Sequence, residues 1–125
     1  MTKQPLFTGS LLMLLAVVAG AIGSHALAPS LTDQQLNSYT LAYQFQVYHA
    51  LGILLLFAIQ KKLSILIPYY LFLLGIILFC GSIYMITYGH IAENESLIGF
   101  FRKVTPVGGI SFMLGWVVLM VKALR

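Results

Sequence analysis

Four long apolar stretches, separated by short polar segments, run through the 125-residue chain. The charge-free runs cover residues 4–32, 34–60, 63–92 and 104–121. A helix needs about 20 mostly apolar residues to cross a bilayer. Each run is long enough to cross once and too short to cross twice, so the pattern predicts four membrane-spanning helices.

Proline, glycine and polar residues set the expected helix boundaries. Pro29 is expected to end the first helix, and Gly89 the third. Thr105 and Pro106 have the residue types of a helix cap and a first helical residue. The connections are expected at residues 29–38 and 91–103. The sequence therefore predicts one transmembrane domain over residues 1–125, with helices at residues 6–27, 39–60, 64–88 and 105–121.

The composition supports this fold class, which is an all-α, integral membrane four-helix bundle. The chain is 60% hydrophobic and only 8% charged, whereas a soluble domain carries roughly a quarter charged residues. A free-standing soluble enzyme is therefore excluded. No Asp, Glu, Lys or Arg falls inside a predicted helix, which argues against transport coupled to a membrane-embedded carboxylate. The net charge of +4 lies in short connections and forms no stripe for nucleic acid.

The basic residues predict the orientation of the bundle. Arg102 and Lys103 fall on one side of the four predicted helices. The side that carries both chain termini receives Lys3, Lys61, Lys62, Lys122 and Arg125. Because basic residues concentrate on the cytoplasmic side, we expect both termini in the cytoplasm.

Small residues recur at helical spacing and predict which helix faces touch. Such faces let two backbones approach closely, and in lipid it is close packing that holds helices together. Packing inside one bundle is favoured over a dedicated dimerisation face. The expected packing residues are Ala16, Gly20, Ser24, Gly81, Gly108, Ser111 and Gly115.

His49 is the one ionisable side chain expected near the bilayer midplane, about 18 Å from Lys61 at 1.5 Å of rise per residue. Gln46 shares its helix face. His49 is either a neutral histidine hydrogen-bonded inside the bundle, or a proton relay or contact to a quinone or lipid headgroup. A candidate polar pocket is formed by His25, Gln46, His49, Ser82, Tyr84 and Thr105.

The sequence contains few features of a metal or cofactor site. His25 and His90 are both expected near the same membrane boundary, and Glu93 and Glu95 follow His90 closely. These side chains could ligate a metal, or they could cap helix ends in contact with water. The spacing matches no tight ligand motif, so no metal site, catalytic residue or cofactor is predicted.

Four stretches together resemble a known family: residues 20–25 (GAIGSH), 45–51 (FQVYHAL), 78–84 (LFCGSIY) and 105–116 (TPVGGISFMLGW). The chain is similar to the four-helix inner-membrane proteins of the YgdD type, which are related to human transmembrane protein 256. The resemblance covers all four helices in order. It implies a bacterial inner-membrane protein, and it brings no activity because the family is one of unknown function.

Two roles are compatible with these observations. The first is a non-enzymatic accessory or interaction subunit, which docks on a larger membrane complex or on a second copy through small-residue faces and interfacial aromatic residues. The alternative is the binding or transport of a lipid, a quinone or a small solute through the polar pocket around His49. An enzyme ranks last, because the sequence contains no catalytic constellation.

Overall fold

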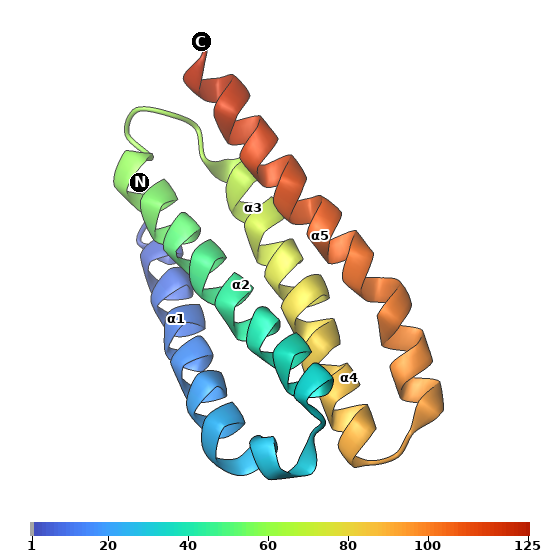
Figure 1. The fold of residues 1–125 in the computed structure, drawn as a ribbon. Helices are drawn as coiled ribbons and strands as arrows, with labels where there is room; N and C mark the ends of the chain where they lie inside the picture. The colour runs from blue at the N-terminus through green and yellow to red at the C-terminus, as the bar shows by residue number, and fades with distance from the viewer. Residues whose placement is uncertain (1) are drawn as a thin grey trace.

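The computed structural model describes residues 2–125, and in it four helical spans alternate in direction (Figure 1). The first span consists of α1 (Gln4–Ile22), the π-helical turn η1 (Gly23–Leu27) and the 3₁₀ turn η2 (Ala28–Ser30). The second is α2 (Asp33–Ile59). The third consists of α3 (Leu66–Gly75), the π-helical turn η3 (Ile76–Cys80) and α4 (Gly81–Ile91). The fourth is α5 (Glu95–Ala123).

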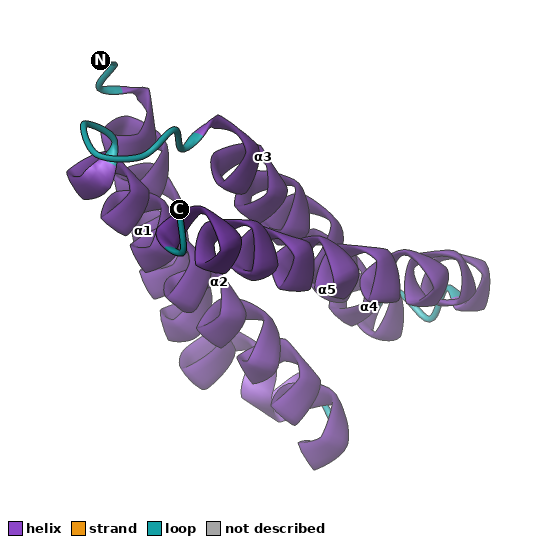
Figure 2. Cartoon of the chain, turned by 90° about the horizontal axis from the view of Figure 1, so that it is seen from above, coloured by secondary structure: helices purple, strands orange, loops and turns teal. Residues whose placement is uncertain are grey.

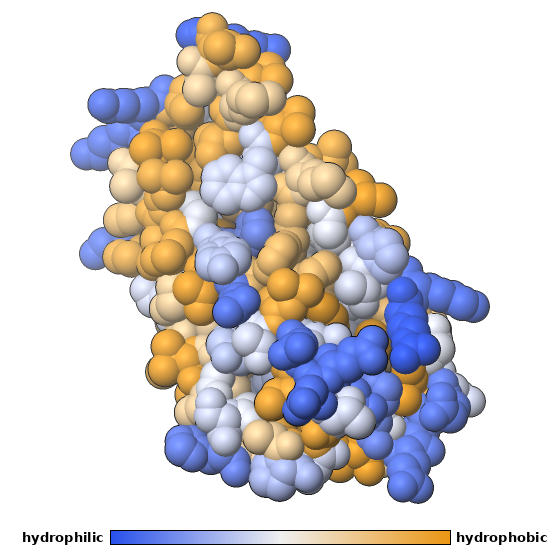
Figure 3. Space-filling model, in the orientation of Figure 1, coloured by the Kyte–Doolittle hydropathy of each residue, from blue (hydrophilic) through white to orange (hydrophobic). Residues whose placement is uncertain are grey.

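All four spans are long and apolar enough to cross a membrane. Over the described residues the chain contains helices and turns and no strand, which confirms the all-α prediction and the number of spans. On the face shown in Figure 3, apolar side chains dominate the middle, and hydrophilic side chains gather at the lower end and at the edges of the upper end. This distribution is the one expected for a bilayer-spanning protein.

The helices form two hairpins, with α1 packed on α2 and α5 packed along α3, η3 and α4. The hairpins join where α2 contacts the third span. Both chain termini and the connection at residues 60–65 lie at one end, called here the termini end (Figure 1). The connections at residues 28–32 and 92–94 lie at the opposite end, called the loop end. Seen from the termini end, the hairpins cross at an angle and diverge toward the loop end (Figure 2).

The helix α5 begins at Glu95, so the predicted start at Thr105 is wrong. The true cap is Asn94, whose side chain accepts a hydrogen bond from the Leu97 N–H at 3.1 Å. Residues 95–104 are therefore helical and do not form a connection. Pro106 lies inside the helix. Since proline has no N–H, the carbonyl of Arg102 lacks its usual helical partner.

The helix α2 likewise starts earlier than predicted. Thr32 and Gln35 form a capping box, with the Gln35 N–H donating to the Thr32 hydroxyl at 3.1 Å and the Thr32 N–H donating to the Gln35 side chain at 3.0 Å. The third span also passes Gly89 and ends at Ile91. Capped polar turns thus extend α2 and α5 beyond their charge-free runs. The prediction that helices contain no charged residue is wrong, because they include Asp33, Glu95, Arg102 and Lys103.

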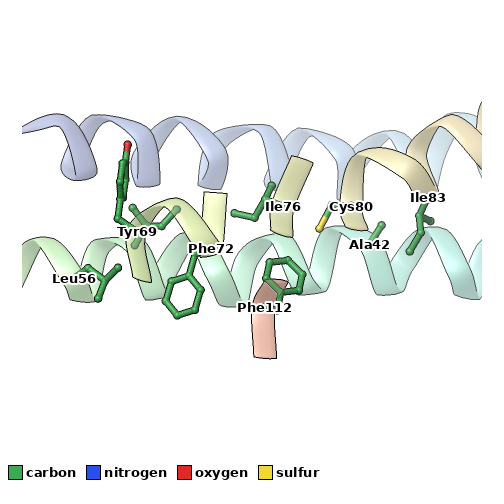
Figure 4. Packing of buried hydrophobic residues seen from close by; sticks show 9 residues of the cluster. Ala42, Leu56, Tyr69, Phe72, Ile76, Cys80, Ile83 and Phe112 are labelled. Carbon is green, nitrogen blue, oxygen red and sulfur yellow. The ribbon is translucent and has the colours of Figure 1, made fainter. Parts of the chain in front are cut away.

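The core lies where α2, the third span and α5 meet. Figure 4 shows its buried side chains in a row along the bundle, from Leu56 and Tyr69 through Phe72, Phe112 and Cys80 to Ile83. At Gly108 a Cβ atom would overlap the backbone of Phe79, so α5 rests directly on the η3 turn. Only a residue without a side chain allows this approach.

The other expected packing residues occupy different environments. Ala16, Ser111 and Gly115 are buried, and a Cβ on Gly115 would lie 2.6 Å from the Phe72 ring. A Cβ on Gly20 would lie 3.4 Å from the Tyr43 ring, whereas Ser24 is exposed and donates to the Gly20 carbonyl at 3.2 Å. A Cβ on Gly81 would point into open space, with no packing neighbour within 4 Å.

Candidate functional site

A groove of about 700 Å³ lies between α2, α4 and α5 at the loop end. Its lining comes from one stripe of residues on α5, one on α4 and η3, and one at the start of α2. The groove forms because α2 and α5 diverge there and the side chains of α4 are left as its floor. We call this cavity the loop-end groove.

The α5 stripe consists of Arg102, Thr105, Pro106 and Gly109. Their spacing of three, four and seven positions places them on one helix face. Arg102 is exposed near the loop end, and Gly109 lies about 10 Å deeper at 1.5 Å of rise per residue. A Cβ on Gly109 would meet the Phe79 ring at an ordinary contact distance of 3.8 Å. The missing side chain therefore leaves room in the deep part of the groove.

The lining residues on the other helices also change from polar to apolar with depth in the groove. On the third span, the half-buried His90 and the buried Thr87 lie near the loop end, and Ile83 and Phe79 lie deeper. On α2, the polar residues Thr32, Gln34, Gln35 and Ser38 precede the apolar Leu41. All three walls thus change from polar at the loop end to apolar toward the middle of the bundle.

Aromatic side chains close the deep end of the groove. We define the central aromatic cluster as Phe45, His49, Phe72, Phe79, Phe112 and Trp116. Phe79 lines the groove and stacks on Phe45, with 4.9 Å between ring centroids. Phe112 packs against both rings, at 6.1 Å from Phe45 and 5.6 Å from Phe79. The middle of the bundle is therefore filled where the groove ends.

His49 lies buried inside this cluster with both ring nitrogens hydrogen-bonded. Its Nδ1 is 2.9 Å from the Phe45 carbonyl oxygen, which can only accept, so Nδ1 carries the proton. Its Nε2 accepts the indole N–H of Trp116 at 3.0 Å. The imidazole also stacks on Phe112, with the ring centroids 3.6 Å apart.

This geometry fits the neutral Nδ1–H tautomer. A second proton on Nε2 would face the Trp116 N–H donor and break that hydrogen bond. The arrangement favours the interpretation of His49 as a neutral histidine that packs the bundle. The donor to its Nε2 is Trp116 of α5, a partner that the sequence did not indicate.

Gln46 instead joins three spans. Its side-chain amide donates to the Leu12 carbonyl in α1 at 2.7 Å, and its oxygen accepts the Tyr84 hydroxyl of α4 at 2.7 Å. Closer to the groove, the Ser82 and Thr105 hydroxyl oxygens lie 2.6 Å apart and link α4 to α5. Within residues 2–125, every buried side-chain nitrogen and oxygen has a hydrogen-bond partner.

The structure does not bring the six expected pocket residues into one cavity. Gln46 with Tyr84, and Ser82 with Thr105, form separate pairs. His49 pairs with Trp116, and His25 is exposed on η1. Of the six residues, only Thr105 lines the groove. In the part of the chain that is described, no three His, Cys, Asp or Glu side chains gather in a way that could hold a metal.

Sequence reasoning missed most of the groove-lining polar residues. Arg102 and Gln34 were assigned to connections, and His90 was considered as a metal ligand or as a cap of a helix end. The signal that could have found them is the helical spacing of Arg102, Thr105 and Gly109, which extends across the expected boundary at Thr105.

The antiparallel spans and the one-sided groove define a small polytopic α-helical membrane protein. The chain belongs to the family described as "Protein of unknown function (DUF423)", which matches residues 19–109. This finding confirms the expected kinship with YgdD-type proteins, and the family has no assigned activity.

The relatives are membrane proteins of similar length. The chain is 32% identical to a UPF0382 membrane protein of Staphylococcus epidermidis, over 98% of this chain and 97% of the relative. It is 32% identical to the UPF0382 membrane protein YwdK of Bacillus subtilis, over 98% of each chain. It is 35% identical to the UPF0382 inner membrane protein YgdD of Escherichia coli, over 87% of this chain and 80% of the relative. No solved structure matches the chain.

Proposed function

We propose that this protein binds an amphiphilic molecule from the membrane in the loop-end groove. The observation that carries the proposal is the shared gradient of the three walls, from Arg102, His90 and Gln34 to the apolar deep end. A bilayer amphiphile has the same gradient, with a polar head at the surface and an apolar tail inside. The groove and its ligand therefore match in polarity along their length.

The size and position of the groove support this role. Its volume of about 700 Å³ is that of a small-molecule site, which usually spans roughly 300–1,000 Å³. The divergence of α2 and α5 gives an amphiphile sideways access from the lipid (Figure 2). The central aromatic cluster fills the bundle beyond Phe79, which supports binding within one leaflet over passage through the protein.

Filling the groove provides the test. Gly109→Leu places a large side chain among the lining residues, whereas Gly99→Leu adds the same side chain to the same helix at an exposed position with open space around it. The three proteins are extracted from native membranes in mild detergent and analysed by native mass spectrometry. We expect a retained amphiphile on the wild-type protein and on Gly99→Leu, and its loss from Gly109→Leu.

Two results would overturn the proposal. One is a wild-type protein that retains no amphiphile, even after incubation with excess membrane lipid. The other is equal retention by both leucine variants, which would place the bound molecule outside the groove. Circular dichroism of each variant establishes that the helices remain folded.

We further propose that both termini face the cytoplasm and that the groove opens toward the opposite surface of a bacterial inner membrane. Five basic residues at the termini end support this orientation, against Arg102 and Lys103 on the first half of α5. The Escherichia coli relative is named an inner membrane protein. A thiol reagent that does not cross membranes should label a cysteine at Glu93 in intact cells, and one at Lys61 only after lysis. The reverse pattern would invert the orientation.

The proposed role is that of a binding protein and not of an enzyme. An accessory role in a larger complex, or in a homo-oligomer, stays a separate prediction. The groove is favoured because several small residues expected at interfaces are used within the bundle, Gly108 against η3 and Gly115 against Phe72.

A further inference from the structure

We infer that the loop-end groove selects amphiphiles whose head group is an oxyanion, either a phosphate or a carboxylate, bound at Arg102. The inference rests on the proposed function and adds the chemical class of the ligand. It is based on a contrast between polar side chains: some already have hydrogen-bond partners, and others do not.

The charged lining of the groove has one sign. Arg102 on α5 and the titratable His90 on α4 line its polar end, and within the described chain no Asp or Glu side chain belongs to the lining. A guanidinium presents five N–H donors in a planar fork that pairs with carboxylate and phosphate oxygens. The polar end of the groove is thus complementary to negative charge.

The groove also offers more donors than its own acceptors use. The Thr87 hydroxyl donates to the Ile83 carbonyl at 3.0 Å, and the oxygen of the Gln35 side chain accepts the Thr32 N–H. Among the side-chain hydrogen bonds of residues 2–125, none involves four of the other lining residues, which are Gln34, Ser38, His90 and Arg102.

A head group that only accepts hydrogen bonds fits this surplus of donors. An ionised phosphate or carboxylate accepts several hydrogen bonds at once, and bonds between charged partners are about twice as strong as neutral ones. A neutral glycerol head offers Arg102 only uncharged oxygens, so its hydrogen bonds lack the added strength of a charged acceptor. The match therefore separates oxyanion heads from neutral heads on the same tail.

The depth of the groove fits one tail. Gly109 and Ile83 lie roughly two helical turns below Arg102 and His90, which is about 10 Å at 1.5 Å of rise per residue. This length covers the first part of a single acyl chain. Phe79 and the central aromatic cluster stop it there, and the rest of the chain leaves sideways between α2 and α5 into the lipid.

The test compares three probes that carry the same oleoyl chain: lysophosphatidylglycerol, oleate and monooleoylglycerol. The protein is purified, reconstituted in uncharged lipid nanodiscs, and the bound fraction of each probe is measured by native mass spectrometry. We expect the wild-type protein to bind each oxyanion probe about tenfold more tightly than monooleoylglycerol, the factor that one hydrogen bond to a charged group supplies.

Arg102→Gln should remove this preference and leave the affinity for monooleoylglycerol unchanged. Lys103→Gln is the matched control, because it removes one positive charge from the next exposed position, which does not line the groove. This control should keep the tenfold preference. If both variants lost this binding preference equally, the probes would be attracted to surface charge in general, and the inference would be overturned.

The remaining outcomes distinguish a failure of the head-group inference from a failure of the proposed function. If the wild-type protein binds all three probes equally, the head-group inference is wrong and the proposed function stands. If it binds none of them, the proposed function fails as well. Millimolar inorganic phosphate should not displace the lysophospholipid, and its displacement would identify a free anion, instead of a lipid, as the ligand.

Discussion

The loop-end groove and the central aromatic cluster lie end to end between the same three helical spans, and their polar side chains differ in hydrogen bonding. In the cluster, both nitrogens of His49 are hydrogen-bonded, to Phe45 and to Trp116, and the ring is stacked on Phe112. In the groove, Arg102 and Ser38 line an open volume of about 700 Å³.

This difference shows how a polar residue within a membrane span should be interpreted. A buried polar group without a partner is expensive in lipid, so natural bundles pair such groups internally. The pairing of His49 and of Gln46 is therefore sufficient to explain both residues as structural. For the polar groups that line a cavity next to an apolar floor, we propose a different explanation, which is a ligand.

The largest difference in unfolding free energy is expected between alanine substitutions at Gly108 and Gly109, two adjacent glycines of α5. Gly108→Ala inserts a methyl group into the backbone of Phe79, and the η3 turn cannot move aside without disturbing the cluster. We expect the free energy of unfolding to fall by about 3 kcal/mol, the upper range for an overpacked core. Titration with sodium dodecyl sulfate in mild micelles, followed by circular dichroism, measures it.

Gly109→Ala is the control for this substitution. Its methyl group would meet only the Phe79 ring at 3.8 Å and would project into the groove. Replacing a helical glycine by alanine should then raise the unfolding free energy by about 0.5–1 kcal/mol. If the two alanine variants were equally stable, the direct contact between α5 and the η3 turn would be wrong.

A smaller effect is expected at the hydrogen bond between Tyr84 and Gln46. Tyr84→Phe removes only the hydroxyl and leaves the Gln46 side-chain oxygen without its donor. The loss should be about 1 kcal/mol of unfolding free energy, as for other interhelical hydrogen bonds in membranes. The same detergent titration applies. Tyr88→Phe removes an exposed hydroxyl from the same helix and should change nothing, so equal effects would contradict a structural role for the pair.

The smallest effect on stability is expected in the groove wall. Ser38 is exposed on α2, so Ser38→Ala should change the unfolding free energy by less than about 0.5 kcal/mol. Its effect should appear in binding, as a roughly threefold weaker affinity for oleoyl lysophosphatidylglycerol when one neutral hydrogen bond is lost. Native mass spectrometry in nanodiscs measures this affinity. Unchanged affinity would remove Ser38 from the head-group site.

The number of spans and the fold class followed from the spacing of charged residues, because a bilayer imposes a minimum length on each apolar run. The start of α5 did not follow, since Thr105 and Pro106 have the residue types of a helix start. The Asn94 cap was present in the sequence, but charged residues at positions 95, 102 and 103 interrupt the segment that follows it. Helix signals at a membrane surface depend on capping more than on hydropathy.

The groove itself could not be predicted. It depends on the angle at which the two hairpins cross, and that angle follows from contacts between the hairpins, such as the stacking of Phe45 on Phe79, that join residues distant in sequence. The same holds for the partner of His49. Helical spacing predicted only that Gln46 shares the helix face of His49, and it could not identify Trp116 of α5 as the donor.

The most direct test of the groove as a ligand site is photolabelling. Vesicles that contain the wild-type protein are mixed with an amphiphile that carries a photoreactive group at the start of its tail, and labelled peptides are identified by mass spectrometry. The account predicts saturable labelling of Ile83 and Ile86, lost in Gly109→Leu and kept in Gly99→Leu. Labelling that never saturates, and that falls on exposed α1 residues such as Val17 as strongly as on the groove, would contradict it.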